Sequence, residues 1–148
     1  MNRSAYSDDL DPWALIRWRG AVAAAIRGTR GQELLHGLAV ALDTMAEKRL
    51  IAHALVTDDG SVCALGALGV CLGRRQELSS LDPGAYEEVA QFFGVAEALV
   101  REIEFINDSG RYGAESETQR WERVRAWVRE HILAAQQTGS KPPALKEG

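Results

Sequence analysis

The sequence predicts a mainly α-helical single domain of five or six helices with one small β-hairpin. Apolar residues recur at spacings of three and four along most of the chain, which is the period of an amphipathic helix. Asp-Pro pairs and capping-box spacings mark helix starts between these stretches. One Asp-Gly pair lies in a segment without that period and indicates a hairpin turn. At 148 residues, of which 46% are hydrophobic, the chain is long enough for one core.

The first helix is expected over residues 12–26. Asp11 can accept hydrogen bonds from the free amides of the first turn, and Pro12 loses no hydrogen bond at the first helical position. Gly28 ends the helix. One face carries the apolar residues Leu15, Trp18, Val22 and Ile26.

A second helix is expected from Thr29 to Met45. Thr29 and Gln32 have the spacing of a capping box, in which the glutamine side chain reaches back to the threonine amide. Its apolar stripe consists of Leu34, Leu35, Leu38, Leu42 and Met45. We expect the first two helices to lie antiparallel across the tight turn between them.

The β-hairpin is expected near residues 50–66, with Asp59-Gly60 as a two-residue type I′ turn. Its second arm is ambiguous, because residues 64–73 are compatible with either a strand or a helix. Their small side chains suit a helix that packs closely against another element, although glycines lower helix stability. We favour a short strand that gives way to a buried helix near Ala64.

In such a hairpin, His53 and Cys63 face opposite sides of the strand pair. That geometry argues against a zinc site and against a catalytic Cys-His pair. No Ser, His and Asp pattern of a nucleophile elbow occurs either. The sequence therefore predicts no metal ion, no cofactor and no catalytic residues, and it favours binding over enzymatic activity.

Three more helices are expected, at residues 83–93, 95–106 and 116–135. The pair Asp82-Pro83 repeats the Asp-Pro helix start, and Gly94 stops the helix that it opens. Ser116 and Gln119 form a second capping box.

The chain divides into an N-terminal arm at 1–11, one domain at 12–136 and a disordered tail at 137–148. No apolar run approaches the ~20 residues that cross a bilayer, and the N-terminus is too polar for a signal peptide. Two cysteines are too few for a disulfide framework. We therefore expect a cytoplasmic protein that does not contact membranes.

The formal net charge of −4 is unevenly distributed. Residues 17–30 contain arginines and no acid, whereas residues 76–114 hold eight acids against two arginines. Dipolar surfaces of this kind steer binding, although a charged stretch is also the ordinary composition of a solvated helix face. The two stretches are therefore competing candidate binding faces.

Several short motifs between residues 18 and 132 resemble a family of small phage and prophage proteins that has no established activity. The motifs are Trp18-Arg19-Gly20-Ala21-Val22, Ala25-Ile26-Arg27-Gly28, Arg30-Gly31-Gln32, Lys48-Arg49-Leu50-Ile51-Ala52-His53, Val62-Cys63-Ala64-Leu65-Gly66-Ala67, Phe93-Gly94, Glu102-Ile103, Asn107-Asp108, Arg120-Trp121 and Trp127-Val128. The resemblance implies a phage origin and a bacterial cytoplasm as the setting, and it transfers no catalytic residue. A weaker likeness, through Cys-Ala-Leu-Gly-Ala and Asn-Asp, extends to actinobacterial domains.

The turn between the first two helices is a candidate anion site. Glycines at a helix N-terminus let backbone amides face an anion, and arginines can bind a phosphate with two hydrogen bonds. The candidate ligand residues are Arg19, Arg27, Gly28, Thr29, Arg30 and Gly31. The alternative is that Gly28 only stops the helix and the arginines are solvated, since the motif lacks the lysine of a phosphate-binding loop.

Residues 86–106 fit a helix-turn-helix template, with Gly94 at the turn. The second helix of the template would carry Glu97, Glu102 and Glu104 against one arginine, and carboxylates repel a phosphate backbone. An ordinary helix corner explains the same pattern. Nucleic acid is therefore the less favoured partner.

Tryptophans beside arginines and acids on the middle helices are candidate partner contacts, because such tryptophans are typical of binding hot spots. These residues are Trp13, Arg17, Arg123, Trp127, Glu97 and Glu104. The leading hypothesis is a non-enzymatic phage accessory protein that binds a host macromolecule through a charged face, with counter-defence as one role. The alternatives are a module that sequesters a nucleotide or another phosphate compound, and a DNA-binding regulator. Self-association into a homodimer is a further hypothesis that the sequence allows.

Overall fold

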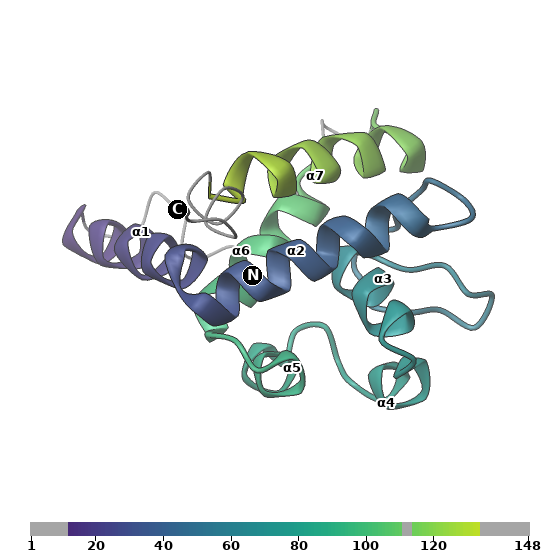
Figure 1. Ribbon diagram of the computed structural model, residues 1–148, viewed down its shortest axis with the longest axis horizontal. Coiled ribbons are helices and arrows are strands. Elements are labelled where there is room, and N and C mark those ends of the chain that lie inside the picture. Colours follow the sequence, from purple (N-terminus) through teal and green to yellow (C-terminus); the bar gives the residue numbers. More distant parts are fainter. Residues whose placement is uncertain (1–11, 111–113, 134–148) are drawn as a thin grey trace, which may run out of the picture.

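The computed structural model describes residues 12–110 and 114–133, and helices dominate them (Figure 1). The helices are α1 (Pro12–Arg27), α2 (Thr29–Thr44), α3 (Ala64–Cys71), α4 (Arg75–Ser79), α5 (Tyr86–Phe93), α6 (Glu97–Asp108) and α7 (Glu117–His131). The mainly α-helical fold class is confirmed. The predicted arm at 1–11, the tail at 137–148 and the capping residue Asp11 lie outside the described residues.

The expected number of five or six helices was wrong, because seven occur in the described residues. The additional one is α4, a helix of five residues in which Leu78 is the one buried side chain. A helix this short has no room for a repeated apolar spacing, so periodicity does not reveal it. Helix was the right alternative for the ambiguous segment, which forms α3 with Cys63 as its N-cap.

The predicted β-hairpin near 50–66 was also wrong. Within the described residues, one isolated bridge between Val56 and Val62 is all that joins the two arms as strands. Gly60 has a φ of +88°, but Asp59 is not in the left-handed region that a type I′ turn needs. Asp59 instead accepts hydrogen bonds from the Thr57 hydroxyl and the Ser61 amide, which closes a loop.

The first arm of this loop is not straight. His53 has a φ of +69°, so the chain bends there, and its amide donates to the Asp108 carboxylate on α6 at 3.2 Å. Nearer the start of the arm, the Leu50 amide donates to the carbonyl of Glu117 at the start of α7. The amides of Leu50 and His53 therefore bind helix ends, while the Ile51 amide between them donates to the Val62 carbonyl of the second arm at 2.9 Å.

The core lies around α2 and α6. α2 packs between α3 and α7, while α6 contacts α1, α3, α5 and α7 and runs behind α2 in Figure 1. The largest fully buried apolar side chains are Leu35, Leu38, Leu42, Leu50, Leu65, Leu78, Leu99, Ile103, Val89, Val100 and Val124. No helix within the described residues is both long and apolar enough to cross a membrane.

The helices α1 and α2 meet end to end at Gly28 and point away from each other, so the expected antiparallel pair was wrong (Figure 1). Gly31 explains the close junction, because a Cβ atom there would lie 1.8 Å from the Ala25 carbonyl oxygen. The predicted capping box of Thr29 is absent. Gln32 is instead buried and donates to the carbonyls of Ile26 and His131.

Two further predicted helix starts had different outcomes. α5 begins at Tyr86 rather than at Pro83, because Asp82 forms a turn by accepting from the Gly84 amide at 2.9 Å. At α7 the predicted capping box of Ser116 and Gln119 is confirmed with both of its hydrogen bonds.

Candidate functional site

The outward face of α1 exposes two large apolar side chains between arginines. Trp13 is 69% exposed and Ile16 is 57% exposed. Arg17 and Arg27 are also exposed, and with about 100° of rotation per residue they fall on the same side of the helix. Gly20 lies at the middle of this side, and apart from the adjoining backbone of α1 nothing lies within 4 Å of the position that a Cβ atom would take. The face therefore combines exposed apolar side chains at one end, a position without a side chain at its middle and positive charge.

The arginines of α1 differ from the other arginines of the described residues. Arg17, Arg19 and Arg27 make no polar contact to any residue that the structure describes. Each of the others makes at least one, namely Arg30, Arg49, Arg74, Arg75, Arg101, Arg120, Arg123, Arg125 and Arg129. Guanidinium groups without internal partners are therefore concentrated on α1.

The candidate anion residues of the turn between α1 and α2 do not form one cluster of the expected kind. Gly31 is buried, while Gly28 and Thr29 are exposed. The Arg30 guanidinium reaches away from α1 and donates to the carbonyl oxygen of Gly94, after α5, at 3.3 Å. Arg30 and Thr29 thus border a groove, whereas Arg19 and Arg27 belong to α1.

This groove, of about 560 Å³, opens between α2, α3 and α5. Its lining residues are Thr29, Arg30, Glu33, Leu34, Gly37, Leu68, Leu72, Arg74, Phe92, Phe93 and Gly94. Arg74 lies over the Phe92 ring at 4.0 Å and is ion-paired with Glu77. Because Glu33 and this ion pair balance the arginines at the rim, the groove has no clear preference for one sign of charge.

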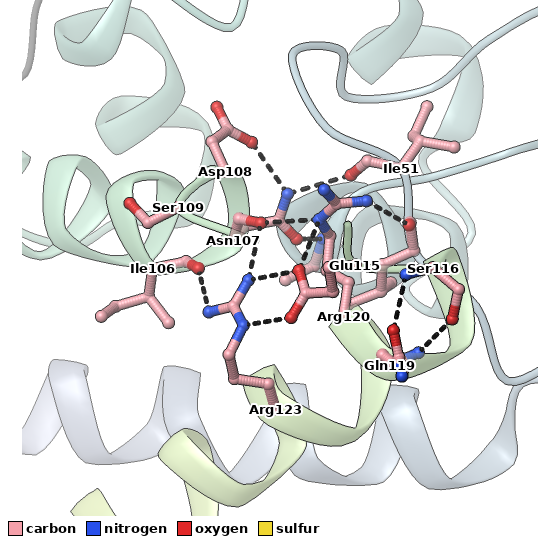
Figure 2. A network of polar contacts seen from close by, with 12 residues as sticks. Ile51, Ile106, Asn107, Asp108, Ser109, Glu115, Ser116, Gln119, Arg120 and Arg123 are labelled. Carbon is pink, nitrogen blue, oxygen red and sulfur yellow. Dashed lines mark hydrogen bonds and ion pairs between the residues drawn. The ribbon is translucent and has the colours of Figure 1, made fainter. Parts of the chain in front are cut away.

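Two candidate partner residues on α7 hold the fold together instead. Arg123 donates to both carboxylate oxygens of Glu115 and to the Ile106 carbonyl, as Figure 2 shows. Trp127 is partly buried and stacks on His131 with ring centroids 4.3 Å apart. Both side chains are therefore occupied within the domain, whereas Trp13 and Arg17 are exposed on α1.

Asn107 is the centre of the polar network in Figure 2. Its side chain is buried, accepts from the Ala64 amide at 3.0 Å and donates to the Ile51 carbonyl at 2.9 Å. Its backbone carbonyl oxygen accepts from Arg120 and Arg123 of α7. One residue thus joins the end of α6 to α3, α7 and the loop before α3.

The acidic candidates lie on α6 in different surroundings. Glu97 is exposed and pairs with Arg101 at 3.2 Å. Glu104 is partly buried, and its Oε2 atom is inaccessible to solvent and has no hydrogen-bond partner among the described residues. α6, which the helix-turn-helix hypothesis assigns to DNA reading, packs against four other helices and is the central helix of the fold.

Glu104 borders a small pocket that the sequence did not predict. The pocket has room for about one water molecule, at about 10 Å³, and its lining residues are His53, Ala54, Cys63, Leu65, Pro83, Ile103, Glu104, Asn107 and Asp108. His53 and Cys63 therefore face the same cavity. The expectation that they lie on opposite sides was wrong, because it rested on a hairpin that does not form.

The pocket changes the acidity of two of its groups. Burial, with repulsion from Asp108 and Asp82, raises the pKa of Glu104 to about 8. Burial also raises the pKa of the Cys63 thiol to about 12, so at neutral pH this thiol is protonated and is a poor nucleophile. The Cys63 sulfur accepts a hydrogen bond from the Gly66 amide, which is an N-cap role.

The described residues contain no group of three or more His, Cys, Asp or Glu side chains that could hold a metal ion. The fold and its surfaces thus define a small helical domain with an exposed basic helix at one end. No family model, no curated protein and no solved structure matches the chain.

Proposed function

We propose that this chain is a non-enzymatic binding protein that docks an acidic protein partner on the exposed face of α1. The observation that carries the proposal is the contrast among the arginines, since Arg17, Arg19 and Arg27 lack partners within the described residues. The resemblance to phage proteins favours a host protein as the partner, with counter-defence as one role.

The chemistry of the face favours a protein over other partners. Trp13 and Ile16 offer apolar area, and tryptophan beside arginine is the composition of interface hot spots. Because Gly20 has no side chain, a partner helix can approach the middle of this face closely. Carboxylates on the partner helix would pair with the arginines of α1. These arginines have no ion pair within the described residues to break before they bind.

Nucleic acid and small phosphate compounds are less well supported. Three arginines on one helix of a chain with net charge −4 neutralise few phosphates, whereas nonspecific nucleic-acid binding grows with the number neutralised. For a phosphate compound, Arg30 would have to leave Gly94, and the buried Gly31 amide is not open to a ligand.

The experiment is a capture from nuclease-treated bacterial lysate, followed by calorimetry with the purified partner. The double variant Arg17→Glu, Arg27→Glu tests the charge and Trp13→Ala tests the apolar end. We expect each to weaken binding at least tenfold, which equals about 1.4 kcal/mol. Arg75→Glu is the matched control, because Arg75 is exposed but donates to the Thr57 carbonyl.

The same experiment separates the other hypotheses. A partner whose retention is unaffected by the α1 variants contradicts the proposal. Material that is retained from untreated lysate but not from the nuclease-treated lysate would identify nucleic acid as the partner instead. A melting temperature that rises with nucleotides, and a rise that Arg30→Ala abolishes, would favour the phosphate alternative.

A further inference from the structure

The pocket beside α6 contains the Glu104 carboxyl group in surroundings that disfavour its charged form. The Oε2 atom of Glu104 is buried and has no hydrogen-bond partner among the described residues, and the pocket walls around it include the apolar side chains of Leu65, Ile103 and Pro83. A neutral carboxyl group tolerates such a cavity, whereas a buried charge without a partner is costly. The closed pocket is therefore the arrangement that suits protonated Glu104.

The charged and titratable groups around Glu104 come from three parts of the fold. Asp108 lies one turn away on α6, Asp82 lies in the loop before α5, and His53 and Cys63 lie on the segment before α3. The carboxylates of Asp108 and Asp82 both repel a charge on Glu104. Within the described residues, no arginine or lysine lines the pocket to offset that repulsion.

Asp108 also anchors the segment of His53 and Ala54, which forms one wall of the pocket. One of its oxygens accepts from the His53 amide at 3.2 Å, and the other lies 3.5 Å from the His53 ring nitrogen Nδ1. The His53 side chain is 76% exposed, and its backbone has a φ of +69° that a residue with a side chain rarely adopts. The position of His53 and Ala54 therefore depends on the Asp108 carboxylate, which a charge on Glu104 would repel.

We propose that His53 and Ala54 form a pH-operated latch over this pocket, closed while Glu104 carries its proton and released when that proton is lost. Release lets water reach the Glu104 carboxylate and exposes the Cys63 thiol. The pKa of Glu104 is about 8 in the closed state and 4.5 for a solvated glutamate. These two values set the pH range over which the latch is released. Opening becomes more frequent as the pH rises from about 4.5 to about 8 and is constant above that range.

The test is the rate at which iodoacetamide alkylates Cys63 at pH 8.5, in full-length protein that carries Cys71→Ser so that one thiol remains. Glu104→Gln keeps the shape of the side chain and removes its charge. We expect alkylation to be at least tenfold faster in the protein that retains Glu104 than in the Glu104→Gln variant. Glu88→Gln, an exposed change on α5, is the matched control and should leave the fast rate unchanged.

The direction of the difference is decisive. In a pocket that stays closed, ionised Glu104 would raise the pKa of the Cys63 thiol further and slow its reaction, so the Glu104→Gln variant would react faster. An equal or faster rate in that variant overturns the latch. Hydrogen exchange at the same pH gives the location: faster exchange of residues 51–54 in the protein with Glu104 supports the latch, and a change confined to residues 81–85 refutes it.

Discussion

At the scale of single residues, Asn107 is one of two buried amide side chains in the described residues, with Gln32, that join distant segments of the chain. It is buried, and its amide group bonds the first residue of α3 and the loop at Ile51. The carbonyl oxygen and the NH2 group of this side-chain amide each have a specific partner, so neither an acid nor an apolar residue can replace both hydrogen bonds.

We predict that Asn107→Asp lowers the free energy of unfolding by about 2 to 4 kcal/mol at pH 7, because it removes the donor to Ile51 and buries a charge. Denaturant titration measures this change. Gln91→Ala, an exposed substitution on α5, is the control and should have little effect. Equal stability of the two variants would contradict the role assigned to Asn107.

Two glycines give a matched pair of predictions. Gly31→Ala places a Cβ atom 1.8 Å from a backbone oxygen and must push α1 and α2 apart, so we expect a loss of about 2 kcal/mol or more. Gly20→Ala meets nothing within 4 Å, and on helix propensity it should gain up to about 1 kcal/mol. Thermal denaturation distinguishes the two outcomes, and a stabilising Gly31→Ala would refute the close junction.

At the scale of elements, the helices that could be predicted were those whose signals are local. The stripe of α1 and the capping box of α7 occur where the spacing of apolar and capping residues placed them. Both signals depend on side chains within one or two turns of each other, so no long-range contact can override them easily.

Elements that depend on distant partners were predicted less well. Residues 50–56 resemble a strand, but the amides of Leu50 and His53 bind α7 and α6, which are about fifty residues or more further along the chain. Thr29 and Gln32 have capping-box spacing, yet Gln32 is drawn into the core by the ends of α1 and α7. A local sequence pattern does not show that a distant helix end will take the hydrogen bonds that a strand or a capping box would use.

The candidate site shows the same division between local and distant signals. Exposure of Trp13 and Arg17 fits their position at the outer face of an amphipathic helix, whereas the pocket of His53 and Glu104 depends on a bend that no sequence signal announces. The helix that was expected over 95–106 is α6, which includes Asn107 and Asp108 in its last turn. The network of Asn107 with distant carbonyls could not be foreseen.

At the scale of the whole molecule, Glu104 should shape the dependence of stability on pH. Its pKa is higher in the folded protein than in the unfolded chain, so its contribution is full below about pH 4.5 and is lost as the pH rises to about 8. We predict that Glu104→Gln removes most of a decline of about 3 kcal/mol between pH 5 and pH 8.5. Denaturant titrations at both pH values measure it, and parallel declines in both proteins would contradict the prediction.

The distribution of charge over the molecule separates two faces. The acids of residues 76–114 include Glu97, which is paired, and Glu104, which is buried in part, whereas the arginines of α1 face outward without partners in the described residues. The exposed acids Glu87 and Glu88 on α5 also have no ion pair in the described residues, so free charge alone does not choose between the faces. α1 differs in that its arginines lie beside the exposed apolar side chains of Trp13 and Ile16.

Hydrogen exchange of the full-length protein, with and without its captured partner, tests most directly whether α1 is the binding face. We expect the partner to slow exchange in residues 13–27 and to leave residues 76–108 unchanged, and we expect the slowing to weaken as the salt concentration rises. Slower exchange confined to residues 76–108, with α1 exchanging as it does in the free protein, would contradict the assignment of α1 as the binding face.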